Sequence, residues 1–339
     1  MPRDAIVIHP DFDAKWPFAA DDLAQAWRTE IGPVNFIRLS IADKRKLGEI
    51  LDEPARVDRL VSMDVPLTTA CVRSMTSLRQ ASFNRKGQLP ADVEAALRDA
   101  DVRVVRHLDK SYWSESVAEL AVGLVIASLR DIVGRHRAIV AGDRAVWDYR
   151  PPEGRSRPDA RGEQFADDPR FVNGTVSGKR VRIVGAGNIA SRFAALCRAL
   201  GADVAAFDPF AAGPAFQLSG ARRVHDLSLL MRDADIFAPL VPMTDSTRGL
   251  VAAEHIDGLR AGSLVVLATR AGVCDMSRLR ERVINGELAL AADVFDTEPL
   301  PTTDPLLGCP NVVLTPHIAG RTRDANRTWA QQLLSFYQI

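Results

Sequence analysis

Short apolar runs alternate regularly with helix-like segments through the second half of the chain, between residues 178 and 316. The apolar runs predict buried strands, and the longer segments between them, such as 190–200 and 276–285, predict helices. Six strands are expected here, at 181–184, 204–207, 236–239, 264–268, 289–293 and 312–314. Because parallel strands need crossover connections, this order predicts an α/β domain built on a doubly wound parallel sheet.

The first hundred residues show the same alternation less clearly. Strands are expected at 5–8, 35–39 and 102–105, and helices at 21–28 and 91–100. A chain of 339 residues has room for about two domains. The predicted fold is therefore α/β, with two Rossmann-like doubly wound parallel-sheet domains and a cleft between them.

A glycine-rich turn follows the first strand of the second half, in the stretch VRIVGAGNIA at 181–190. Gly185 permits a tight turn, Gly187 lets the backbone approach a pyrophosphate, and the small Ala190 lets the next helix lie close to the strand. The first turn of that helix offers free N–H groups and a positive dipole end to phosphates. This pattern predicts a dinucleotide site.

The acidic residue that should accompany this turn is Asp208, at the end of the next expected strand. A carboxylate there can accept both ribose hydroxyls of an adenosine and would repel a 2′-phosphate, which favours NAD over NADP. One residue is out of place, because Arg182 lies inside the first strand, and central parallel strands are usually apolar.

Three polar residues come just after expected strands farther along. Arg270 follows LVVLAT, Glu298 lies in ADVFDTEPLP, and His317 lies in VVLTPHIAG. In a doubly wound sheet, ligands bind at the carboxyl ends of the strands, so all three should point toward a bound nicotinamide. Each could separately be a turn or surface residue, but their occurrence together after a dinucleotide fingerprint favours catalysis.

These residue types suit the reduction of a 2-oxo acid. An arginine binds a carboxylate and a carbonyl oxygen with a fixed fork of donors. A histidine can give up a proton near neutral pH, and a glutamate beside it favours the imidazolium form. We therefore predict that Arg270 binds substrate and that His317, supported by Glu298, is the general acid/base.

The charge balance and the apolar stretches of the chain argue against several classes of protein, although a local charged patch stays possible. The 43 Lys and Arg balance the 43 Asp and Glu, whereas a dedicated nucleic-acid or membrane-surface binder needs a basic excess. The start of the chain lacks the pattern of a secretory signal, and the longest apolar stretch, at 117–129, is shorter than the roughly 20 residues of a spanning helix. We expect a cytoplasmic protein with no nucleic-acid or membrane partner.

Four cysteines are scattered through the chain, with no Cys-x-x-Cys pair and no cluster with histidine: Cys71, Cys197, Cys274 and Cys309. Scattered cysteines are more often buried thiols than ligands, so we expect four buried thiols and no metal site.

Two segments between the expected domains stand out. The stretch 114–130, SESVAELAVGLVIASLR, predicts a buried helix, and Ser116 followed by Glu119 fits a capping box at its start. Residues 141–170 contain four prolines and dense charges of both signs, which predicts a long exposed loop with helical pieces at most. That loop could be a solvated insertion, shape the mouth of the active site or contact another subunit.

Between residues 114 and 320 the sequence resembles the D-isomer-specific 2-hydroxyacid dehydrogenases. The helix SESVAELAVGLVIASLR, the segment SGKRVRIVGAGNIA, and then VPMTDSTRGLV, ATRAG, ADVFDTEPLP and NVVLTPHIAG follow in the order of that family. The resemblance implies that Arg270 binds substrate, that His317 is the catalytic histidine and that Glu298 pairs with it. It also implies that Asp293 holds the nicotinamide carboxamide. The predicted cofactor-binding residues are Gly185, Gly187, Asn188, Ile189, Asp208, Pro242, Thr247, Thr269 and Asp293.

The resemblance further implies a domain organisation. Residues 1–112 with 320–339 would form the substrate domain, closed by a last helix at about 324–338, and residues 113–319 would form the NAD-binding domain. The family is usually dimeric through the cofactor domain, which places the expected homodimer interface on the apolar helix at 117–130.

Several positions depart from the family pattern. Leu267 stands where the family has an asparagine before the arginine, and Leu240 where a histidine is common. The substrate-binding loop reads SFNRKGQLPAD at 82–92 in place of a glycine-rich loop. Asn84, Arg85 and Lys86 could replace the usual loop contacts, or could form a solvated basic turn.

Three functions are compatible with these residues. The first is an NAD-dependent dehydrogenase acting on a small 2-oxo/2-hydroxy acid. The second is an NAD(H)-sensing, corepressor-like binding protein of the same fold, which turnover of a substrate would exclude. The third is a formate dehydrogenase, which Glu298 disfavours because that branch carries glutamine there.

Overall fold

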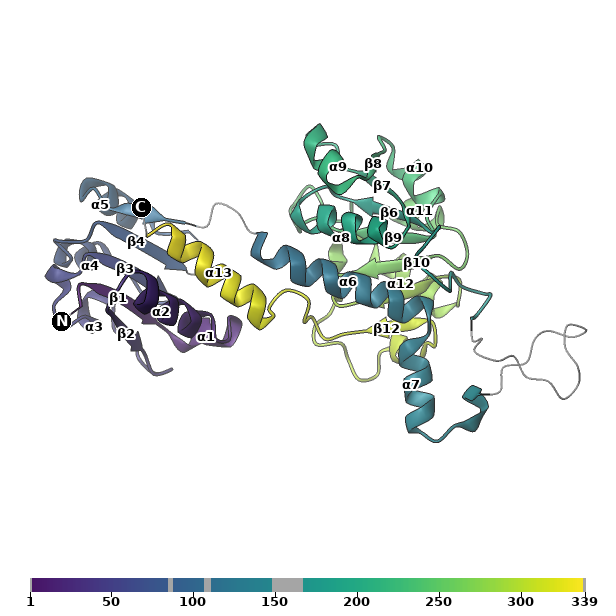
Figure 1. Ribbon diagram of the computed structural model, residues 1–339, viewed down its shortest axis with the longest axis horizontal. Helices are drawn as coiled ribbons and strands as arrows, with labels where there is room; N and C mark the ends of the chain where they lie inside the picture. The colour runs from purple at the N-terminus through teal and green to yellow at the C-terminus, as the bar shows by residue number, and fades with distance from the viewer. Residues whose placement is uncertain (1, 85–87, 107–110, 148–166, 338–339) are drawn as a thin grey trace, which may run out of the picture. The chain divides into compact units, whose positions relative to one another are not determined.

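The computed structural model describes residues 2–84, 88–106, 111–147 and 167–337. The chain forms two compact units, one of Met1–Tyr112 with Arg321–Ile339 and the other of Trp113–Gly320. Each contains a parallel sheet with helices, which confirms the predicted α/β class (Figure 1).

The first unit is built on a five-stranded parallel sheet with the order β2-β1-β3-β4-β5. Its strands are β1 (Asp4–Ile8), β2 (Val34–Arg38), β3 (Arg59–Met63), β4 (Gln80–Asn84) and β5 (Arg103–Val105). The prediction missed β3 and β4. Both carry a buried serine, Ser62 or Ser82, among their apolar residues, so neither is a continuous apolar run.

Helices around this sheet include the end of the chain. They are α1 (Pro10–Lys15), α2 (Ala19–Glu30), α3 (Leu47–Ile50), α4 (Thr69–Ser74), α5 (Ala91–Asp99) and α13 (Arg323–Ser335). Figure 1 shows α13 beside α2, although almost the whole chain separates them in sequence. Trp329 of α13 is buried, with its ring 5.5 Å from that of Phe12. This aromatic contact helps to hold the C-terminal helix in the N-terminal unit.

The second unit has a seven-stranded parallel sheet with the order β12-β11-β10-β9-β6-β7-β8. The strands are β6 (Arg180–Val184), β7 (Asp203–Phe207), β8 (Arg222–Arg223), β9 (Ile236–Pro239), β10 (Leu264–Leu267), β11 (Ala289–Ala292) and β12 (Val312–Leu314). Six match predicted strands. The seventh, β8, is only two residues long and leaves no periodic signal. The order reverses between β6 and β9, which is the switch point where such folds bind ligands.

Seven helices accompany this sheet in the described part of the unit: α6 (Ser114–Leu129), α7 (Ile132–Val140), α8 (Asn188–Ala199), α9 (Gly213–Ser219), α10 (Leu227–Arg232), α11 (Ala253–Asp257) and α12 (Met276–Ile284). The predicted capping box on α6 is wrong. The helix begins at Ser114, and its N-cap residue, Trp113, makes no side-chain cap. Ser116 instead donates a hydrogen bond to the carbonyl of Ala319, so its hydroxyl serves a tertiary contact.

The apolar helix α6 is a core helix of the second unit. The helix and the turn before it, Ser111–Leu129, are together long and apolar enough to cross a membrane. From the sequence, this stretch was expected to be too short. Ala118, Ala121 and Val125 are buried, however, and α6 packs against α8 and strands β10 and β11. Its composition therefore has an explanation in the core of this unit.

The arginine inside the first strand, Arg182, has its charge compensated at the amino ends of the strands. The guanidinium is 1% exposed and contacts two carboxylates, Asp203 at 2.8 Å and Asp233 at 2.5 Å. It also donates to the carbonyls of Asp203 and Val181. A buried charge needs such partners, so Arg182 is compatible with a central strand.

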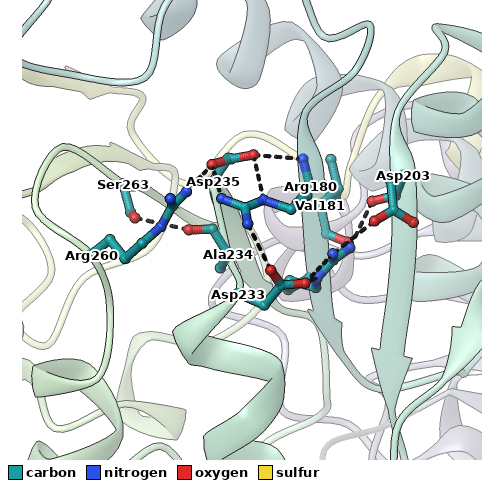
Figure 2. A network of polar contacts seen from close by, with 9 residues as sticks. Arg180, Val181, Asp203, Asp233, Ala234, Asp235, Arg260 and Ser263 are labelled. Atoms are coloured by element: carbon teal, nitrogen blue, oxygen red, sulfur yellow. Dashed lines mark hydrogen bonds and ion pairs between the residues drawn. The ribbon is translucent and has the colours of Figure 1, made fainter.

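Figure 2 shows the wider network to which these carboxylates belong. Arg180 contacts Asp233 at 2.8 Å and Asp235 at 2.9 Å, and Arg260 also contacts Asp235. We call this set, with Arg182 and Asp203, the amino-end network. Burial raises the pKa of Asp233, but its hydrogen bonds and charge contacts with Arg182 and Arg180 outweigh burial and lower the pKa overall.

The predicted insertion at 141–170 lies mainly outside the described residues. Its described beginning contains a 3-10 turn at Arg144–Trp147, which agrees with the expected helical pieces. The choice between a solvated insertion, a part of the active-site mouth and a subunit contact depends on residues 148–166, which are not among the described ranges.

Candidate active site

The glycine turn lies between β6 and α8, and its geometry requires glycine. Gly185 has a φ of 109°. A Cβ there would lie 2.8 Å from the carbonyl oxygen of Leu240 and 2.9 Å from Cγ1 of Val241. Any side chain at Gly185 would therefore clash with the neighbouring β9 connection as well as strain the backbone.

Gly187 is the N-cap residue of α8, and a Cβ placed on it would meet no atom within 4 Å. The start of α8 therefore borders open space, with the N–H groups of its first turn available to an anion. Asn188 and Ile189 open the helix beside this space, and Ala190 is buried against the core. These features fit the pyrophosphate of a dinucleotide.

Asp208 follows β7 and binds the glycine turn directly. Its Oδ2 accepts a hydrogen bond from the N–H of Ala186 at 2.9 Å, and its Oδ1 accepts from Phe210 and Ala211 at 2.9 and 3.0 Å. The structure thus brings the predicted ribose carboxylate and the predicted phosphate turn together.

The other residues predicted to bind the cofactor make contacts within the protein. Thr247 donates to the carbonyl of Pro242 at 2.6 Å and accepts from the N–H of Thr244 at 2.8 Å, which closes the turn after β9. Thr269 is buried and donates to the carbonyl of Pro239 at 3.1 Å. Both threonines hold the carboxyl edge of the sheet, and direct contact with a cofactor remains a prediction.

His317 and Glu298 form the closest pair of predicted catalytic residues. His317 Nδ1 lies 2.7 Å from Oε2 of Glu298, and the two side chains are 44% and 35% exposed. An ionised carboxylate can only accept a hydrogen bond, so Nδ1 carries the proton. The other ring nitrogen, Nε2, is left to exchange a proton with a ligand.

Glu298 stays ionised through the neutral range. Burial raises the pKa of Glu298, but this is outweighed by the hydrogen bonds from His317 and the Phe295 N–H and by the charges of His317 and Arg270, so the pKa lies below its ordinary value. The Phe295 N–H donates to Oε1 at 2.9 Å. Each oxygen of Glu298 therefore has a donor, which fixes the carboxylate that faces His317.

Arg270 lies just after β10 and is exposed. Its Nη1 donates to the carbonyl of Thr269 at 2.6 Å, and its positive charge helps to lower the pKa of Glu298. The guanidinium is thus available to an anion near the carboxylate that supports His317. The structure gathers all three predicted residues at the carboxyl edge of one sheet.

Two residues near His317 have contacts that the sequence pattern did not predict. Asp293 is fully buried and accepts hydrogen bonds from the loop that carries His317. Ser116 of α6 donates to Ala319 at the end of the same loop. The spacing of Ser116 and Glu119 drew attention to this serine, but predicted a helix cap instead of a contact with Ala319.

The leucines that depart from the family pattern are buried. Leu240 is 4% exposed and Leu267 is 0% exposed, each within an apolar core cluster. They contribute packing where the resemblance would place polar groups. In the other unit, Asn84 ends β4 and its carbonyl accepts from Asp64, while Arg85 and Lys86 lie outside the described residues.

The cysteines carry no reactive cluster. Cys71, Cys197 and Cys274 are buried, whereas Cys309 is only partly buried, so the expectation of four buried thiols is wrong at one position. Burial raises the pKa of Cys197 to about 12, which keeps it a thiol. Within the described ranges, no three His, Cys, Asp or Glu side chains gather as metal ligands.

The match to a protein-family model agrees with a dinucleotide site in the second unit. The model described as D-isomer specific 2-hydroxyacid dehydrogenase, NAD binding domain, matches residues 123–319, which is more than half of the chain. NAD is therefore the cofactor of this domain.

Among curated relatives, the D-3-phosphoglycerate dehydrogenase of Archaeoglobus fulgidus is 32% identical over 211 residues, covering 62% of this chain but 36% of that protein. The hydroxypyruvate reductase of Thermotoga maritima is 30% identical over 294 residues, covering 82% of this chain and 86% of that protein. The chain thus spans little more than a third of the first relative and most of the second.

Solved structures share the fold. The phosphoglycerate oxidoreductase from Rhizobium etli superposes with a TM-score of 0.73 at 20% identity, covering 99% of this chain and 94% of the other. At that identity the likeness shows the fold alone. Together with the matched NAD-binding domain, the identity to the hydroxypyruvate reductase shows that the chain belongs to the D-isomer specific 2-hydroxyacid dehydrogenase family.

Proposed function

We propose that the protein is an NAD-dependent oxidoreductase that interconverts a small 2-oxo acid and the corresponding D-2-hydroxy acid. The observation that carries this proposal is the 2.7 Å contact between His317 and Glu298 at the same sheet edge as Arg270. The glycine turn of the same unit supplies a dinucleotide site. The names of the relatives, phosphoglycerate dehydrogenase and hydroxypyruvate reductase, support this substrate class.

Each residue would have one task in reduction. Arg270 would hold the carboxylate and the carbonyl oxygen of the substrate. His317, with Nδ1 donating to Glu298, would deliver a proton from Nε2 to the carbonyl oxygen as it becomes a hydroxyl. Glu298 would stabilise the imidazolium before that transfer. NADH, when bound, supplies the hydride for the carbonyl carbon. In the reverse direction His317 would accept the proton.

The first unit would carry the substrate-binding segments, as the resemblance implies for residues 1–112 and 320–339. We further propose that the protein acts in the cytoplasm, since the relatives' names denote metabolic dehydrogenases.

A panel of substrates tests the proposal. Oxidation of NADH is followed by absorbance at neutral pH with glyoxylate, hydroxypyruvate, 3-phosphohydroxypyruvate, pyruvate, and branched-chain and aromatic 2-oxo acids. We expect turnover with at least one of them. NADH binding without turnover across the panel would contradict the proposal and favour a cofactor-sensing protein.

Replacing Asp208 with alanine should change cofactor preference. The carboxylate that favours a free ribose over a 2′-phosphate is lost, so NADH affinity should fall about tenfold while NADPH affinity falls less or rises. Fluorescence titration with each cofactor measures both constants. Equal losses for the two cofactors would show that Asp208 acts only through its hydrogen bonds within the protein, from Ala186, Phe210 and Ala211.

Replacing Glu298 with glutamine should slow reduction. The variant keeps a hydrogen-bonding side chain but loses the negative charge that faces His317 at 2.7 Å. Turnover at neutral pH should therefore fall, measured as kcat/KM, while NADH affinity is unchanged. A variant with unchanged turnover would show that the charge of Glu298 has no part in proton delivery.

The helix α7 supports the expected homodimer. None of its residues is buried, and Ile132, Val133, Ile139 and Val140 are 49%, 39%, 49% and 73% exposed. By contrast, most apolar residues of α6 lie in the core. We therefore propose that a second copy of the chain covers α7, since exposed apolar clusters mark interaction sites.

Aspartates at Ile139 and Val140 should weaken this dimer. Burying two carboxylates in an apolar interface is unfavourable, so light scattering should show dissociation at higher protein concentrations than in the wild type. Leu218→Asp on α9 is the matched control, because Leu218 is 85% exposed on another helix of this unit. A monomeric wild-type protein, or equal effects of both changes, would refute the assignment to α7.

A further inference from the structure

The loop that carries His317 is fastened to the buried carboxylate of Asp293. Asp293 directly follows β11 and is 0% exposed. Its Oδ1 accepts from the hydroxyl of Thr315 at 2.7 Å and from the N–H of Ile318 at 2.9 Å. Its Oδ2 accepts from the N–H of Ala319 at 2.9 Å. Both oxygens are therefore engaged by residues on either side of His317.

The backbone at His317 needs such support. Its φ is 54°, a left-handed backbone conformation that costs free energy for residues other than glycine. The N–H of Thr315 also donates to the carbonyl of Ala292, the residue before Asp293. At the far end of the loop, Ser116 donates to the carbonyl of Ala319. Hydrogen bonds to an ionised carboxylate are the stronger part of this set.

We propose that Asp293 is a positioning residue for His317. By accepting three hydrogen bonds from the loop 315–319, it would hold the strained backbone of His317 in the orientation that meets Glu298. This inference rests on the proposed role of His317. It is separate from the role that the resemblance implies, contact with the nicotinamide carboxamide, because it rests on the three hydrogen bonds from the loop.

Replacing Asp293 with asparagine tests the proposal. Asparagine has one acceptor oxygen, and its NH2 group would face one of the loop donors, so at least one of the three hydrogen bonds is lost. The amides of Ile318 and Ala319 should exchange with solvent faster, and the ring resonances of His317 should shift or broaden. Turnover should fall about 10- to 100-fold, as for other supporting partners of a site residue, with NADH affinity within about threefold of the wild type.

Thr315→Val is the matched second variant, because it removes one donor and leaves both N–H bonds to Asp293. We expect a smaller change in the same His317 resonances and in turnover. This variant also tests the proposal if Asp293→Asn does not fold. In that case, His317 resonances in Thr315→Val identical to those of the wild type would overturn the positioning role of Asp293.

Two results distinguish the possible failures. Unchanged amide exchange and His317 resonances in Asp293→Asn, with NADH affinity lost, would overturn the positioning role and favour the carboxamide contact. If Asp293→Asn altered the amide exchange and the His317 resonances, but the wild-type protein turned over no 2-oxo acid, two conclusions would follow. Asp293 would still support the loop, and the proposed reaction would be wrong.

Discussion

Alanine in place of His317 should lower turnover by about 10²- to 10⁴-fold, the usual contribution of a positioned general acid. The change removes the proton donor at Nε2 and leaves Glu298 without its partner at 2.7 Å. NADH affinity should stay within about threefold of the wild type, because the glycine turn and Asp208 are not altered. Steady-state kinetics with the best substrate, together with NADH titration, measure the two quantities.

His317→Gln is the control for packing, because it restores much of the side-chain volume without an acid at neutral pH. We expect it to be as inactive as the alanine variant. Full activity in either protein would show that another group delivers the proton.

The amino-end network gives the second large expected effect. Changing both Asp203 and Asp233 to alanine would leave the buried guanidinium of Arg182 with carbonyl acceptors only. Leaving a buried charge without its partner typically costs about 3–5 kcal/mol of unfolding free energy. Urea unfolding at neutral pH measures this loss.

Arg182→Leu is the informative control. Asp203 and Asp233 are 55% and 42% exposed, so both carboxylates remain solvated when the arginine is removed. The cost should be about 1 kcal/mol or less, because the change leaves no buried charge without a partner. If Arg182→Leu destabilised the protein as strongly as the double change, the guanidinium itself would be the stabilising group.

The network should also make stability depend on pH in a defined direction. The pKa of Asp233 is lowered in the folded protein from a usual 3.8. Its contribution is therefore present above that value and is lost as the pH falls toward the folded pKa. Acid unfolding should be less steep in Arg182→Leu than in the wild type.

Most of the second unit could be predicted from sequence because its buried strands, apart from β6 with Arg182, are continuous apolar runs. The strands after which Arg270, Glu298 and His317 occur follow this rule, and the fold then brings the three residues to one edge. In the first unit, β3 and β4 were missed because buried serines interrupt their apolar runs. Residue pattern cannot tell a serine that is buried in a sheet from one that faces water.

Tertiary hydrogen bonds explain the remaining differences. Ser116 has the spacing of a capping box, but its hydroxyl reaches Ala319, about two hundred residues later in the chain. Arg182 is unexpected in a central strand from the sequence alone, but in the folded chain Asp203 and Asp233 lie beside it and compensate its charge. Local sequence carries no information on partners that only the folded chain brings near.

The most direct test of the account is the fate of the hydride. The wild-type protein would be incubated with NADH that carries deuterium at both C4 positions and with the 2-oxo acid that it reduces fastest. The product would be analysed by mass spectrometry and chiral chromatography. We predict deuterium at C2 of the D-2-hydroxy acid, and formation of this product about 10²- to 10⁴-fold more slowly with His317→Ala. Product of the L configuration, deuterium absent from C2, or NADH bound but not oxidised would contradict the account.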